Sequence, residues 1–158
     1  MRPVFAFDPT TITRLPQPVD EVLLVIDGAI TRTNRDEAAH LDLNAIRSLP
    51  AHSLHTNTVV TDGVKHFEGV LMRDLLELVG AIGTTVQART LNNYSVDIPM
   101  SDFYDYDVVL ASHMDATQLL PSGKGPLWIV YPRDQWRQLQ DIRYDYRWAW
   151  QLNRLTVK

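Results

Sequence analysis

Several polar side chains in this sequence stand where they could hold a flat ligand with many hydrogen-bonding groups. Thr56 and Thr58 alternate along SLHTNTVVT, so their hydroxyl groups would share one face of a strand, or form its solvent-exposed edge. Asn93 and Tyr94 bring an amide and a phenol to a predicted turn, where turn chemistry alone also accounts for the asparagine. Lys124 lies between two glycines in GKGPLWIVYP. A lysine presented in this way either holds a phosphate or an acidic edge, or is solvated.

A cluster of aromatic and charged residues, RYDYRWAW, surrounds Arg147 near the end of the chain. A guanidinium beside aromatic planes can stack on a flat ring or donate a fork of hydrogen bonds to a carbonyl-bearing one. The alternative for Arg147 is an ion pair with Asp141 or Asp145. In an extended segment Trp148 and Trp150 would share one face, and both indoles could then belong to the hydrophobic core.

Composition and motif content argue against several kinds of chemistry. The 158 residues contain no cysteine, which excludes disulfides, thiolate metal sites and a cysteine nucleophile. The five histidines show no HxH or HExxH spacing, and GxSxG, P-loop and GxGxxG motifs are absent. A net charge of −4 without a basic block disfavours a nucleic-acid partner. No apolar run approaches the ~20 residues of a membrane span, so membrane insertion is not expected.

Short strands and few helices would position these side chains. Hydrophobic period and turn signals predict strands at residues 22–30, 53–61, 86–91, 94–98, 108–114, 127–131 and 148–157. The same signals predict a helix after Asp42, a helix that ends at Gly80 and a short helix capped at Ser101, with an irregular loop over residues 133–145. The pattern indicates one strand-rich α+β domain over residues 21–158, preceded by a lead-in segment of residues 1–20.

Five segments occur in the order expected of one known family. They are FEGVLMRDLL at residues 67–76, LNNY with IP at residues 91–99, LA with MD at residues 110–115, KGPLWIVYP at residues 124–132 and WQL at residues 150–152. Together these segments resemble the molybdopterin-binding domain of the sulfite oxidase fold, over roughly residues 20 to 158. The resemblance implies a compact, strand-rich α+β domain with a pocket that holds a pterin.

The sequence departs from that family at the metal ligand. In the catalytic members a cysteine ligates molybdenum. Its position falls at or near Thr56, whose hydroxyl cannot supply the thiolate that such a centre uses. We therefore expect a non-catalytic pterin-binding protein without molybdenum, which holds a reduced pterin or a molybdopterin-like one. The residues expected to bind it are Thr56, Thr58, Asn93, Tyr94, Lys124 and Arg147. The alternative is a molybdopterin-dependent oxidoreductase whose metal is held without a protein thiolate.

The same resemblance implies a partner and a compartment. Small stand-alone members that lack the cysteine look like exported ligand sensors that work beside cyclic-di-nucleotide signalling receptors. We therefore expect a ligand sensor in the periplasm, with a membrane-bound receptor of that kind as its partner and a signal peptide trimmed from the chain. The cytoplasm is the alternative, because residues 1–20 lack the long apolar core of a secretory signal.

Overall fold

The computed structural model of the chain describes residues 14–158. Residues 1–13, which are most of the predicted lead-in segment, lie outside the described residues. The rest of that segment, residues 14–20, makes hydrogen bonds to the domain. The backbone N–H groups of Val19 and Asp20 donate to the Asp42 carboxylate at 2.9 and 3.0 Å.

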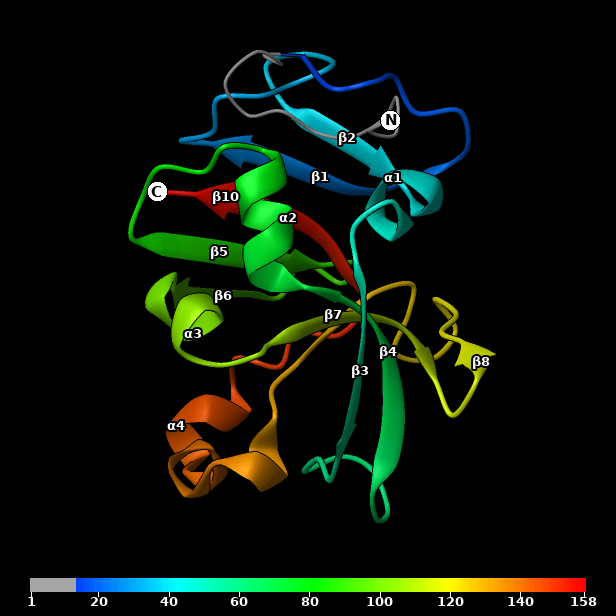
Figure 1. The fold of residues 1–158 in the computed structure, drawn as a ribbon, viewed down its shortest axis with the longest axis vertical. Coiled ribbons are helices and arrows are strands. Elements are labelled where there is room, and N and C mark those ends of the chain that lie inside the picture. Colours follow the sequence, from blue (N-terminus) through cyan, green and yellow to red (C-terminus); the bar gives the residue numbers. More distant parts are fainter. Residues whose placement is uncertain (1–13) are drawn as a thin grey trace, which may run out of the picture.

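Two five-stranded sheets occupy the upper and lower halves of Figure 1. The first sheet contains, in order, β2 (Ala39–Asp42), β1 (Val22–Gly28), β10 (Leu152–Val157), β5 (Thr85–Thr90) and β6 (Ser95–Pro99). The second contains, in order, β3 (Ala51–Thr56), β4 (Lys65–Leu71), β7 (Val109–Met114) and β8 (Thr117–Gln118), with β9 (Trp128–Val130) paired to β7. Among the strand pairs of the described residues, β1 with β10 alone is parallel.

Short helices connect these strands. They are α1 (Leu43–Arg47), α2 (Met72–Leu78), α3 (Ser101–Asp105) and α4 (Ile142–Asp145), with 3-10 turns η1 (Arg133–Gln135) and η2 (Arg137–Gln140) before α4. The protein is therefore a strand-rich α+β domain, as the sequence predicted.

Several local signals in the sequence act as expected. The Asp42 side chain begins α1 by accepting a hydrogen bond from the Ala45 N–H at 2.8 Å. Gly80, with a positive φ of 63°, follows α2 and lets the chain leave the helix. Asn93 has a φ of 66° in the turn between β5 and β6, a conformation that asparagine tolerates.

The predicted strand at residues 148–157 was wrong in its first part. β10 begins only at Leu152. Gln151 has a positive φ of 55°, and its N–H donates to the carbonyl of Lys124 at 2.9 Å. Because the chain turns here instead of extending, the argument that the two tryptophans share one strand face does not hold.

Three further boundaries differ from the prediction. The strand expected over residues 53–61 ends at Thr56, whose hydroxyl bonds to the neighbouring backbone. The loop expected over residues 133–145 contains η1, η2 and α4, and the Asp141 side chain caps α4 by accepting a backbone hydrogen bond. The N-cap of α3 is Met100, which makes no side-chain capping bond, and not the predicted serine.

One hydrophobic core joins the two sheets. Phe67 and Trp128 are fully buried there, with ring centroids 5.2 Å apart in an edge-to-face contact. A Cβ at Gly69 would lie 1.9 Å from the carbonyl oxygen of Leu110, so only glycine fits at the register shift in the antiparallel pairing of β4 with β7. No helix within residues 14–158 is long and apolar enough to cross a membrane.

Candidate functional site

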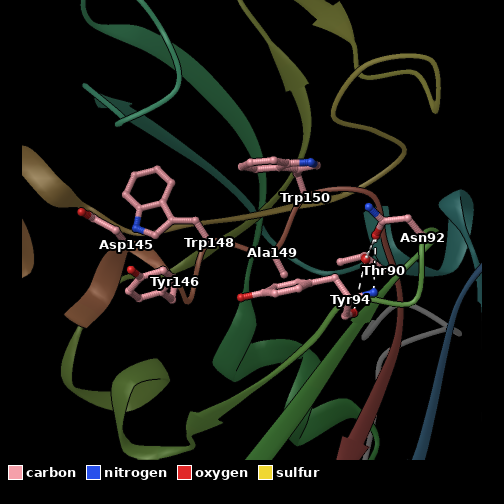
Figure 2. A pocket seen from close by; sticks show the side chains of 8 residues that line it. All are labelled: Thr90, Asn92, Tyr94, Asp145, Tyr146, Trp148, Ala149 and Trp150. Carbon is pink, nitrogen blue, oxygen red and sulfur yellow. Dashed lines mark hydrogen bonds between the residues drawn. The ribbon is translucent and has the colours of Figure 1, made fainter. Parts of the chain in front are cut away.

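A cavity of about 290 Å³ opens between two segments that are far apart in the sequence. One is the turn between β5 and β6, and the other joins α4 to β10 (Figure 2). The lining is mostly aromatic and consists of Thr90, Asn92, Tyr94, Asp145, Tyr146, Trp148, Ala149 and Trp150. A hollow with aromatic walls and a few polar groups is typical of a site for a small flat ligand.

The turn between β5 and β6 forms one wall of the cavity and is stabilised by hydrogen bonds among its own residues. Thr90 Oγ1 donates to Asn92 Oδ1 at 2.5 Å and to the carbonyl of Tyr94 at 3.2 Å (Figure 2). The Tyr94 N–H donates to Asn92 Oδ1 at 3.4 Å. The turn is therefore ordered by its own side chains, while the Tyr94 ring, 48% exposed, projects into the cavity.

Aromatic rings form the opposite walls. The rings of Tyr94 and Trp150 are both seen edge-on in Figure 2 and face each other across the cavity. Trp150 is 37% exposed, whereas Trp148 is buried, with its ring 6.1 Å from the ring of Tyr131. A flat heteroaromatic ring between Tyr94 and Trp150 would stack on both.

Two buried polar atoms of the lining residues have no hydrogen-bond partner in the described part of the chain. One is Trp148 Nε1, which is turned toward the end of the cavity where Asp145 and Tyr146 lie (Figure 2). The other is Asp145 Oδ1, which forms an ion pair at 4.0 Å with Arg133 Nε, an atom that also lacks a hydrogen-bond partner. A buried donor without a partner costs about 1–3 kcal/mol. A ligand that offers an acceptor to Trp148 would recover part of that cost.

Lys124 contacts the cavity wall without lining the cavity. Its Nζ lies 4.8 Å from the ring centroid of Trp150 and 5.8 Å from that of Trp128. Gln151 holds the loop that precedes Lys124 in place. Its side-chain amide donates to the carbonyls of Pro121 and Gly123 at 3.0 and 2.8 Å. Lys124 lines a second, more open groove of about 450 Å³. Trp150 therefore touches both the cavity and the lysine.

Thr56 and Thr58 lie outside both hollows, and local bonds occupy their hydroxyls. Thr56 is fully buried, and its Oγ1 donates to the Asn57 carbonyl at 3.0 Å and accepts from the Asp134 N–H at 3.2 Å. Thr58 Oγ1 lies 2.7 Å from the hydroxyl of Thr61 and also accepts a backbone hydrogen bond. The structure does not bring these hydroxyls together with Tyr94.

Arg147 pairs with a residue that sequence reasoning did not consider. Its Nη1 donates to Asp102 Oδ2 at 2.6 Å, so the predicted alternative of an ion pair with Asp141 or Asp145 was wrong. Partial burial alone would lower the pKa of the Arg147 guanidinium, but the hydrogen bond and charge of Asp102 outweigh burial and raise it. Burial raises the pKa of the Tyr131 hydroxyl well above its ordinary value, and the Asp102 charge raises it further.

The predicted site residues and the residues that line the cavity thus overlap in part. Tyr94 lines the cavity, Asn93 shapes its turn and Lys124 contacts its wall, whereas Thr56, Thr58 and Arg147 do not line it. Sequence reasoning missed the remaining polar and aromatic lining residues, Thr90, Asn92, Asp145, Tyr146, Trp148 and Trp150. The aromatic density of RYDYRWAW is the signal that could have identified most of them.

The donor set offers little to a metal ion. Within residues 14–158 no group of three or more histidine, aspartate or glutamate side chains is placed to hold one. The chain has no thiolate, and the Thr56 hydroxyl is committed to backbone groups. These residues fit a flat organic ligand and do not fit a metal ion held by protein side chains.

Comparisons with known proteins point to one family. The sequence model of one protein family, the oxidoreductase molybdopterin binding domain, matches residues 33–137, which include the turn that carries Tyr94. No curated protein matches the chain. The crystal structure of the sulfane dehydrogenase SoxCD from Paracoccus pantotrophus has the same fold, with a TM-score of 0.62 at 18% sequence identity. That match covers 85% of this chain and 37% of the other. The family and fold expected from the resemblance are thus confirmed.

Proposed function

The chain belongs to the oxidoreductase molybdopterin-binding domain family, and from that premise we propose that it binds a molybdopterin-type pterin as the cofactor domain of an oxidoreductase. The observation that carries the proposal is the pair of facing rings, Tyr94 and Trp150, across a cavity of about 290 Å³. A pterin is flat and aromatic, and its amide and amine edge needs hydrogen-bonding partners.

The residues of the cavity supply what such a ligand requires. Tyr94 and Trp150 would stack on the two faces of the pterin and exclude water from them. Trp148 Nε1, a buried donor without a partner in the described residues, would donate to a ring nitrogen or carbonyl. Lys124 has no carboxylate within 4.0 Å in the described residues, and its ammonium would meet an anionic tail beyond Trp150.

When bound, a molybdopterin supplies redox chemistry through the metal that its dithiolene carries. The chain itself offers no thiolate for that metal. In this proposal the protein binds and orients the pterin and shields its faces. Any metal would be held by the cofactor itself, without a protein thiolate.

A second candidate function is a pterin-binding protein that works without metal. The commitment of the Thr56 hydroxyl to Asn57 and Asp134 favours this alternative, because the position expected of the metal ligand is used to fasten the backbone. A ligand sensor with a membrane-bound cyclic-di-nucleotide receptor as partner would belong to this alternative. That partner and the periplasmic location remain predictions.

Elemental analysis separates the two functions. The protein is purified from cells that make molybdopterin, its molybdenum is quantified, and the pterin released on denaturation is measured by fluorescence and mass spectrometry. Molybdenum in proportion to the pterin supports the oxidoreductase proposal. A pterin without molybdenum supports the second function. A folded protein that releases neither contradicts both.

A further inference from the structure

A closed circuit of contacts surrounds Trp148, the buried indole in the cavity wall. Its ring lies on that of Tyr131, with centroids 6.1 Å apart and planes at 29°. The Tyr131 hydroxyl donates to Asp102 Oδ2 at 2.7 Å, and Arg147 Nη1 donates to the same oxygen at 2.6 Å. Arg147 directly precedes Trp148 in the chain, which closes the circuit.

Both charges of the circuit are largely removed from water. The side chains of Asp102 and Arg147 are 8% and 23% exposed, and the Arg147 guanidinium also lies 4.6 Å from the ring of Tyr144. Charge-assisted hydrogen bonds are short and strong, and a satisfied buried network is rigid. Arg147 fastens the backbone beside Trp148, while Tyr131 packs on its ring. Arg147 and Tyr131 both donate a hydrogen bond to the Asp102 carboxylate.

We propose that Asp102 and Arg147 are positioning residues for the cavity. They set the orientation of Trp148, and with it the direction of the unpartnered Nε1, without touching the ligand. The sequence predicted instead that Arg147 contacts the pterin, but its guanidinium is held by α3, and Arg147 does not line the cavity. The part of this inference that concerns ligand affinity rests on the function proposed above. The part that concerns Trp148 rests on the protein alone.

The test compares Arg147→Ala and Arg147→Lys with a matched control, Arg143→Ala. Arg143 forms an exposed pair with Asp141 at 3.0 Å, outside the circuit. The chain contains four tryptophans, so fluorine NMR of protein labelled with 5-fluorotryptophan can follow each of them. The Trp148 resonance is assigned with Trp148→Phe. The second measurement is the dissociation constant for 6-hydroxymethylpterin, from quenching of its fluorescence.

Arg147→Ala is expected to shift or broaden the Trp148 resonance and to weaken pterin binding about tenfold, the effect of losing one charge-assisted hydrogen bond. Arg147→Lys keeps a cation beside the Asp102 carboxylate and is expected to retain most of the affinity. Arg143→Ala is expected to change neither measurement. Weaker binding with an unmoved Trp148 resonance would mean that Arg147 touches the ligand directly, and it would overturn the proposal. No change in either measurement would overturn it as well.

A second variant covers the case in which Arg147→Ala fails to fold. Tyr131→Phe removes one hydroxyl and keeps the ring, and it is expected to move the Trp148 resonance through loss of the bond to Asp102. An unmoved resonance in Tyr131→Phe overturns the proposal. If the wild-type protein does not bind the probe, the proposed function fails, whereas the resonance still decides whether the circuit positions Trp148.

Discussion

Replacement of Trp150 by alanine tests the stacking wall of the cavity. The indole is 37% exposed and faces Tyr94 (Figure 2). Stacking of a heterocyclic base on an aromatic side chain is worth about 1–3 kcal/mol. Trp150→Ala should therefore weaken pterin binding by about 5- to 150-fold. Lys124 would also lose a cation–π contact worth about 0.5–1 kcal/mol, which is small beside the stability of a domain.

The assay is a fluorescence titration of the purified protein with 6-hydroxymethylpterin. Trp136→Ala is the control, because Trp136 is 41% exposed and packs on Tyr106 outside the cavity. The same substitution at a similarly exposed indole is expected to leave the dissociation constant unchanged. Wild-type affinity in Trp150→Ala, or an equal loss in Trp136→Ala, would refute the reasoning.

Three further predictions concern stability and the local roles of single residues. Thr56→Val should lower the unfolding free energy in urea by about 1 kcal/mol by leaving the Asp134 N–H unpaired, with pterin affinity unchanged; a loss of affinity would show that Thr56 meets the ligand. Gly69→Ala should cost about 3 kcal/mol or more in the same assay, because its Cβ would meet the Leu110 carbonyl, and normal stability would contradict the contact of β4 with β7. Burial alone would raise the pKa of Asp42, but four backbone N–H donors together lower it, so the contribution of the carboxylate to stability is present above the unfolded pKa of about 3.9 and lost as pH falls through the folded value. The stability deficit of Asp42→Asn should therefore shrink between about pH 6 and pH 2.5, and a constant deficit would contradict this assignment.

The sequence predicted the features that local chemistry determines. The Asp42 cap, the end of α2 at Gly80 and the left-handed Asn93 in the turn after β5 each follow from one residue and its neighbours. The strand-rich α+β class followed from the spacing of such signals. Tyr94 was expected to bind the ligand because of the family resemblance, and the turn after β5 presents its ring to the cavity.

The remainder of the site depends on contacts between distant segments. The turn at Gln151 is held by a hydrogen bond from its N–H to the carbonyl of Lys124. The hydrophobic periodicity of residues 148–157 does not predict a bond to so distant a residue. Arg147 pairs with Asp102, which lies 45 residues away in the sequence, although carboxylates stand much closer to it along the chain. Trp150 lines the cavity because the chain turns at Gln151. The sequence pattern does not show this turn, and it therefore allowed Trp150 to be placed in the core.

The central claim is that the cavity between Tyr94 and Trp150 holds a pterin. Its most direct test is the amount of pterin that co-purifies with the wild-type chain and with Trp150→Ala, measured by fluorescence and mass spectrometry after denaturation. We predict a stoichiometric pterin in the wild-type protein and a marked loss in the variant. A folded wild-type protein without pterin, or equal pterin content in both proteins, would contradict the claim.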